Sequence, residues 1–168
     1  VIRSKTGDQK GAVTDLRNAV LMAPEEFGIR MNLGVLYLRL EQWDSAIVHF
    51  EKVKMHAEVN DMLFNNLGYA YLKSGDLQNA SKHLQKAIEL NSENPVAQAN
   101  FGFLLLKLND FEGARNALTQ AEELNPGIYI TYRYKAELEF LEGNTKKACT
   151  DLQTAISLGL PFEETPVI

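Results

Sequence analysis

Alanine recurs along this chain at a constant interval of 34 residues, and this period constrains the fold more than any other feature. The alanines are Ala12, Ala46, Ala80, Ala114 and Ala148, with no insertion or deletion between them. A fixed period of roughly 20 to 50 residues is typical of proteins built from similar stacked units. The chain is therefore expected to be a repeat array, in which each unit buries its apolar face against its neighbours.

The residues after each alanine predict a helix. Apolar residues follow four and seven positions later, and this i, i+4, i+7 spacing places them on one helix face. The first set is Leu16, Phe50, Leu84, Leu118 and Leu152, and the second set is Ala19, Val53, Ala87, Ala121 and Ala155. Before each alanine lies a break such as Gly75-Asp76, where glycine can end one helix and aspartate can cap the next.

Upstream of each break, a first helix is predicted with glycine near its middle. The segments are Leu33-Gly34-x-x-Tyr37, Leu67-Gly68-x-x-Tyr71 and Phe101-Gly102-x-x-Leu105. Glycine in a helix interior costs about 1 kcal/mol relative to alanine. Its recurrence therefore indicates that another helix crosses too closely for a side chain, and we expect Gly34 and Ala46 to form such a pair.

This pattern resembles the tetratricopeptide repeat, a helix-turn-helix unit of 34 residues. The resemblance covers essentially the whole chain and implies an all-α fold, a right-handed α-solenoid of stacked helix pairs. It divides a single domain, 1–168, into a partial repeat 1–26, full repeats 27–60, 61–94, 95–128 and 129–162, and a tail 163–168. The last repeat departs from the pattern, because Lys135, Ala136 and Glu139 replace a large apolar residue, glycine and tyrosine.

The first repeat is only half present, and the chain begins Val1-Ile2-Arg3 without an initiator methionine. Residues 1–5 are expected to end a first helix, and residues 10–22 to form the second. We therefore expect a processed or excised piece of a longer protein.

Composition and motifs argue against several functional classes. The net charge of -5 offers no basic surface for nucleic acid, and no apolar run approaches the roughly 20 residues of a membrane-spanning helix. No phosphate loop or hydrolase motif occurs. His49 and His83 share a repeat position, but surface histidines are favoured over a metal site. Cys149, the single cysteine, is expected to be buried structure. We expect no enzyme, metal or cofactor, and a soluble protein with a cytoplasmic location favoured.

The resemblance places a ligand site on the concave wall that the first helices form. Asn32, Asn66 and Asn100 share one repeat position, and their amides would hydrogen-bond the main chain of an extended peptide. Apolar anchors of the partner would contact Met31, Val35, Leu38, Met62, Tyr69, Leu72, Phe103 and Leu106, and its acidic flanks would meet Arg39, Lys73 and Lys107. Alternatively, the leucines pack on their own neighbours and the lysines are ordinary solvated residues.

These residues predict a non-catalytic protein–protein interaction module, an adaptor or assembly scaffold, for a peptide with apolar anchors and acidic flanks. The carboxylate clamp of repeats that hold the acidic tails of heat-shock chaperones is rejected, because Met31 and Val35 replace its lysine and asparagine. Two alternatives stay open. The segment could self-associate into a homo-oligomer, with its tail 161–168 entering a neighbour, or serve as the substrate-recruiting arm of a larger enzyme such as a glycosyltransferase.

Overall fold

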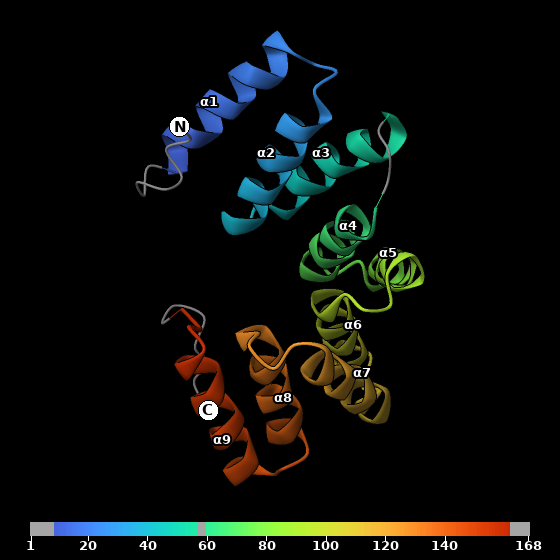
Figure 1. Cartoon of the computed structure of the whole chain (residues 1–168), viewed down its shortest axis with the longest axis vertical. Helices are drawn as coiled ribbons and strands as arrows, with labels where there is room; N and C mark the ends of the chain where they lie inside the picture. The colour runs from blue at the N-terminus through green and yellow to red at the C-terminus, as the bar shows by residue number, and fades with distance from the viewer. Residues whose placement is uncertain (1–8, 57–59, 162–168) are drawn as a thin grey trace. The chain divides into compact units, whose positions relative to one another are not determined.

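The structure is a computed structural model that describes residues 9–56 and 60–161. Over these residues the chain forms nine α-helices and no strand (Figure 1). They are α1 (Gln9–Met22), α2 (Phe27–Arg39), α3 (Trp43–His56), α4 (Asp61–Ser74), α5 (Leu77–Leu90), α6 (Pro95–Lys107), α7 (Phe111–Leu124), α8 (Tyr129–Leu141) and α9 (Thr145–Ser157). The helix expected within residues 1–5 and the tail 163–168 lie outside the described residues.

Helix packing follows the predicted repeat. Within repeats, α2 packs on α3, α6 on α7, and α8 on α9; between repeats, α1 packs on α2, α3 on α4, and α7 on α8. Each of these elements is 13 or 14 residues long and is joined to the next by a short connection. The expected all-α array of helix-turn-helix repeats is confirmed.

The chain divides into two compact units, Val1–His83 (the first unit) and Leu84–Ile168 (the second unit). The division falls inside α5. The first unit therefore contains α1 to α4, and the second contains α6 to α9. The assignment of all the repeats to one domain stays a prediction.

The break between the two helices of each full repeat contains a residue in the left-handed region. Glu41 (φ 56°), Gly75 (φ 91°), Asn109 (φ 60°) and Gly143 (φ 82°) share one repeat position. Glycine and asparagine adopt this conformation readily, but a glutamate there is strained. The packing of the helix pair, rather than the residue type, therefore sets the backbone at Glu41.

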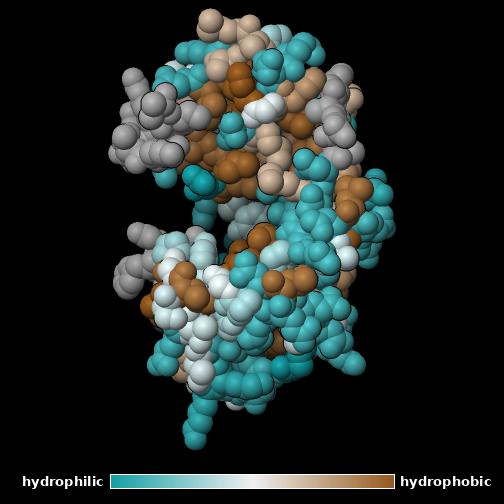
Figure 2. Space-filling model, viewed as in Figure 1, coloured by the Kyte–Doolittle hydropathy of each residue, from teal (hydrophilic) through white to brown (hydrophobic). Residues whose placement is uncertain are grey.

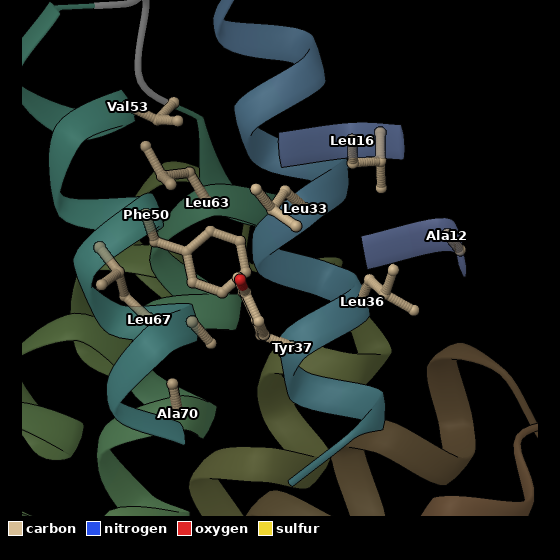
Figure 3. Packing of buried hydrophobic residues seen from close by; sticks show 11 residues of the cluster. Ala12, Leu16, Leu33, Leu36, Tyr37, Phe50, Val53, Leu63, Leu67 and Ala70 are labelled. Atoms are coloured by element: carbon tan, nitrogen blue, oxygen red, sulfur yellow. The ribbon is translucent and has the colours of Figure 1, made fainter. Parts of the chain in front are cut away.

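Phe50 of α3 is the centre of the first unit's core. Its side chain is completely buried, and Figure 3 shows its ring between the side chains of α2 and α4. Leu33 comes from α2, Leu67 from α4 and Leu16 from α1, so the core cluster that contains Phe50 draws on four helices.

Gly34 of α2 lies directly against this ring. A Cβ atom on Gly34 would lie 2.5 Å from Cε1 of Phe50, which is closer than packed atoms approach. Gly102 repeats the arrangement in the second unit, where a Cβ would lie 2.8 Å from Cγ of Leu118. The close approach predicted for the recurring glycine is confirmed at both positions. The nearest atoms at Gly34, however, belong to Phe50 and not to the expected partner Ala46.

Replacing Gly34 by alanine should therefore destabilise the first unit, although alanine is the better helix former. We expect Gly34→Ala to lower the free energy of unfolding by about 1 to 3 kcal/mol, because the added methyl group overpacks the core around Phe50. Gly28→Ala is the matched control in the same helix, since a Cβ there meets no atom within 4 Å. It should leave the stability unchanged or raise it by up to about 1 kcal/mol. Urea denaturation of both variants measures the difference, and equal effects would contradict the packing argument.

Candidate functional site

The predicted ligand residues of the first unit lie on α2 and α4, which contact each other. We call those that keep exposed surface the first-helix face: Met31, Asn32, Val35, Leu38 and Arg39 on α2, and Met62, Asn66, Tyr69 and Lys73 on α4. Asn32 and Arg39 are exposed, Asn66 is half-buried, and Met62 is 58% exposed. The remaining members are partly buried. All nine side chains keep some surface that a partner can reach.

Trp43 joins two members of this face. The Tyr69 ring packs edge-on against Trp43, with the ring centroids 6.2 Å apart, and Lys73 Nζ lies 5.5 Å from the Trp43 centroid. Lys73 thus makes a cation–π contact within the protein, where the sequence indicated only a charge for an acidic partner. The sequence analysis did not select Trp43 as a site residue. The sequence feature that could have identified it is a large aromatic residue at the start of α3.

The structure corrects the expectation of an open ligand surface at four positions, three apolar anchors and one amide of the predicted ladder. Leu72, Asn100, Phe103 and Leu106 are at most 5% exposed. In the second unit, the Phe103 ring stacks on Tyr134 with a centroid distance of 4.3 Å. A partner could reach these four side chains only by displacing packed atoms, so packing on neighbours describes them better than ligand contact.

Lys107 is exposed, but it is not a free charge. Its Nζ lies 2.7 Å from Oε1 of Glu137 and 4.7 Å from the centroid of the Phe103 ring. Both contacts lie within the second unit. An acidic partner at Lys107 would therefore have to compete with a glutamate of the same chain.

Cys149 is exposed on α9, so the expectation that it is buried is wrong. The preceding residue, Ala148, is completely buried. Successive residues of a helix point about 100° apart, which turns Cys149 away from the interface that Ala148 occupies.

The two histidines at the shared repeat position lie against tyrosines. The His49 ring stacks on Tyr37 and the His83 ring on Tyr71, each with a centroid distance of 5.4 Å. His83 is only 4% exposed, so it is not the surface residue that was expected. Burial lowers the pKa of both histidines. Within residues 9–56 and 60–161, no cluster of three potential metal ligands occurs.

Glu139 of α8 is a buried carboxylate with partners from three positions. It is 1% exposed and accepts hydrogen bonds from Arg115 Nη1 at 2.7 Å, Lys147 Nζ at 2.8 Å and Asn144 Nδ2 at 2.9 Å. Arg115 also pairs with Glu142. Burial alone would raise the pKa of Glu139, but these hydrogen bonds outweigh it and lower the pKa to about 2. The glutamate that replaces the tyrosine of the repeat pattern is thus paired with basic groups in an ionic network.

Apolar residues are prominent on the surface of the first unit. On the face that Figure 2 shows, hydrophobic side chains gather over α1 to α3, whereas the visible surface of the second unit is mainly hydrophilic. Leu21 and Met22 at the end of α1 are 79% and 86% exposed. None of the helices in the described part of the chain combines the length and hydropathy that a bilayer crossing requires.

Two family models of the tetratricopeptide repeat match the sequence, one over residues 4–58 and the other over residues 71–132. No curated protein gives a significant match.

Solved structures with a similar fold cover nearly the whole chain. MamA is 20% identical with a TM-score of 0.72, and the match covers 93% of this chain and 91% of that chain. TTC0263, a thermophilic TPR protein in Thermus thermophilus, is 18% identical with a TM-score of 0.80 and coverages of 93% and 86%. YrrB, a TPR protein with an unusual peptide-binding site, is 24% identical with a TM-score of 0.64 and coverages of 94% and 81%. At these identities the likeness shows the fold alone.

The Glu139 network should make the second unit sensitive to acid. The pKa of Glu139 is about 2 in the folded chain against 4.5 for a free side chain. Its stabilising contribution, roughly 3 kcal/mol, is therefore complete above pH 4.5 and is lost as the pH falls towards about 2. Glu139→Gln should be less stable than the parent at about pH 6, and this difference should vanish as the pH falls.

Urea denaturation at several pH values measures this difference. Glu123→Gln is the control, because Glu123 is exposed, and it should change the stability by less than about 0.5 kcal/mol. A difference between the parent and Glu139→Gln that does not change with pH would contradict the ionic role of Glu139.

Proposed function

Because this chain belongs to the tetratricopeptide-repeat family, we propose that it is a non-catalytic protein–protein interaction module that binds an extended segment of a partner on the first-helix face. The observation that carries this proposal is the combination of side chains on α2 and α4. Two amides, Asn32 and Asn66, lie on neighbouring helices among partly exposed apolar side chains. An apolar surface with a few polar groups is the usual composition of a ligand site.

The amides and the apolar residues have different roles. Each amide offers a donor and an acceptor, and an extended peptide presents unpaired main-chain groups at a regular spacing. Met62, Val35 and Tyr69 would contact the apolar side chains of such a peptide, and Met62 adapts well because methionine is flexible and polarizable. YrrB, which has a similar fold, has a peptide-binding site, and this supports a peptide ligand here.

Charge favours a partner segment with acidic flanks. Arg39 is exposed at the end of α2, and Lys73 lies at the corresponding end of α4, over the Trp43 ring. A carboxylate near either cation would be attracted, and such complementary charges set the orientation of a bound segment. The proposed role of the chain is that of an adaptor or assembly scaffold for a protein with such a segment.

A charge placed at Met62 tests this proposal. We expect Met62→Glu to weaken the binding of a peptide at least tenfold, about 1.4 kcal/mol, because the carboxylate would meet the apolar anchors of the peptide. The ligand is the best binder from a phage-displayed library of random peptides, synthesised with a fluorescent label. Fluorescence anisotropy measures its affinity.

Val48→Glu is the matched control, since Val48 of α3 is 54% exposed and lies outside the first-helix face. It should leave the affinity within about twofold, and both variants should unfold as cooperatively as the parent. Equal affinities of the two variants would move the ligand away from the first-helix face. Concentration-dependent mass in light scattering without peptide would favour self-association instead.

A further inference from the structure

A cavity of about 570 Å³ lies between α1 and α3, with residues of α2 also in its lining. We call it the α1–α3 cavity. It shares no residue with the first-helix face. Its lining contains three cations, Arg17 of α1, Arg30 of α2 and Lys52 of α3, together with His49 and Tyr37, and contains no acid. The chain as a whole, by contrast, carries a net charge of -5.

The three cations are not neutralised by the part of the chain that the structure describes. Arg30 Nη2 donates to the carbonyl oxygen of Pro24 at 3.2 Å, but no ion pair forms between Arg17, Arg30 or Lys52 and a carboxylate of the described residues. Arg30 Nε and His49 Nδ1 are buried and meet no hydrogen-bond partner among those residues. The cavity therefore presents donors and positive charge without a carboxylate in its lining.

All three cations are near enough to His49 to affect its pKa. Burial lowers the pKa of this imidazole, and the charges of Arg30, Lys52 and Arg17 lower it further. The three side chains, which come from different helices, thus all act on the same ring. An anion placed beside His49 would be attracted by all of them.

The next repeat shows what occupies the corresponding position when the chain supplies its own anion. Thirty-four residues after Arg17, Tyr37 and His49 stand Glu51, Tyr71 and His83. Glu51 Oε1 accepts a hydrogen bond from the Tyr71 hydroxyl at 3.2 Å and lies 3.6 Å from His83 Nε2. Burial and this carboxylate raise the pKa of Tyr71 to about 12.

The last repeat gives a second example. Glu139 stands three repeats after Tyr37, and this carboxylate lies beside Arg115, Lys135 and Lys147 in a smaller cavity of about 140 Å³. Arg115 and Lys147 both donate to it. Twice within this chain, therefore, a glutamate of the chain itself binds neighbouring basic or hydroxyl groups, although Glu51 and Glu139 stand at different repeat positions. The α1–α3 cavity has the basic groups, Arg17, Arg30 and Lys52, and has no glutamate in its lining.

We propose that the α1–α3 cavity binds a carboxylate side chain from an acidic peptide segment of a partner protein. The carboxylate lies between Arg17, Arg30 and Lys52 and accepts hydrogen bonds from their free donors. A neighbouring apolar side chain of the segment packs on Val20 and Leu21, of which Leu21 is 79% exposed.

An adjoining cavity of about 330 Å³ extends this site. It shares Pro24, Arg30 and Lys52 with the α1–α3 cavity and adds Phe27, Met55 and Glu25. Phe27 and Met55 can hold a second apolar side chain. Glu25 is the one acid in either lining, and it repels further carboxylates from that end. A bound segment is thus expected to carry its acidic residue at the α1–α3 cavity and an apolar residue beyond it.

The test uses two blocked hexapeptides, Ala-Leu-Glu-Glu-Leu-Ala and its amide counterpart Ala-Leu-Gln-Gln-Leu-Ala, with the complete 168-residue chain labelled with nitrogen-15. We expect the glutamate peptide to shift the amide signals of α1 and α3 residues around His49 in a saturable manner. The glutamine peptide should bind at least tenfold more weakly. Equal binding of the two peptides would overturn the proposal.

Reversal of the charge at Lys52, in the lining of the α1–α3 cavity, provides the second measurement. Lys52→Glu should weaken the binding of the glutamate peptide at least tenfold. Lys82→Glu makes an equal change of net charge at an exposed residue outside the cavity lining, and it should weaken the binding less than threefold. Met62→Glu should have no effect, which separates this site from the first-helix face. Equal losses for Lys52→Glu and Lys82→Glu would overturn the proposal. Inorganic phosphate binding as tightly as the peptide would also overturn it, because the cavity would then be an unspecific anion site.

Discussion

The contact between a large side chain of the second helix and a glycine of the first helix is the constraint on which this structure depends. Phe50 against Gly34 and Leu118 against Gly102 bring the two helices of a repeat close enough for their small residues to be buried. Phe50 also belongs to the same core as side chains of α4 in the next repeat. The same ring therefore stabilises both the helix pair of its own repeat and the packing of that repeat on its neighbour. The conformation of Glu41, strained at φ 56°, is a consequence of holding that pair together.

Much of the fold could be predicted from the sequence because the repeat interval is constant. An alanine every 34 residues fixes the register of each second helix, and the apolar residues that follow it fix the buried face. Ala12, Ala46, Ala80, Ala114 and Ala148 are all completely buried. The left-handed turns at Gly75 and Asn109 follow from residue types that favour this conformation.

The candidate site was less predictable, because exposure depends on residues far away in the sequence. Phe103 lies at a repeat position that the family leaves open, but Tyr134 of α8 covers it. From the sequence, Glu139 was only a replacement of the tyrosine in the repeat pattern. Its partner Arg115, which stands 24 residues earlier, could not be identified from that pattern. A helical pattern gives the direction of a side chain relative to its own helix. It does not give the identity of the side chain that comes to meet it.

The exposed thiol of Cys149 has a practical consequence. The sequence contains one cysteine, and it lies in the second unit, whereas the first-helix face and the α1–α3 cavity belong to the first. A maleimide reagent would therefore attach the chain to a biosensor surface at a single chosen point. Every immobilised molecule would be held through α9 in the same chemical manner, with no linkage made to either of the surfaces proposed to bind partners.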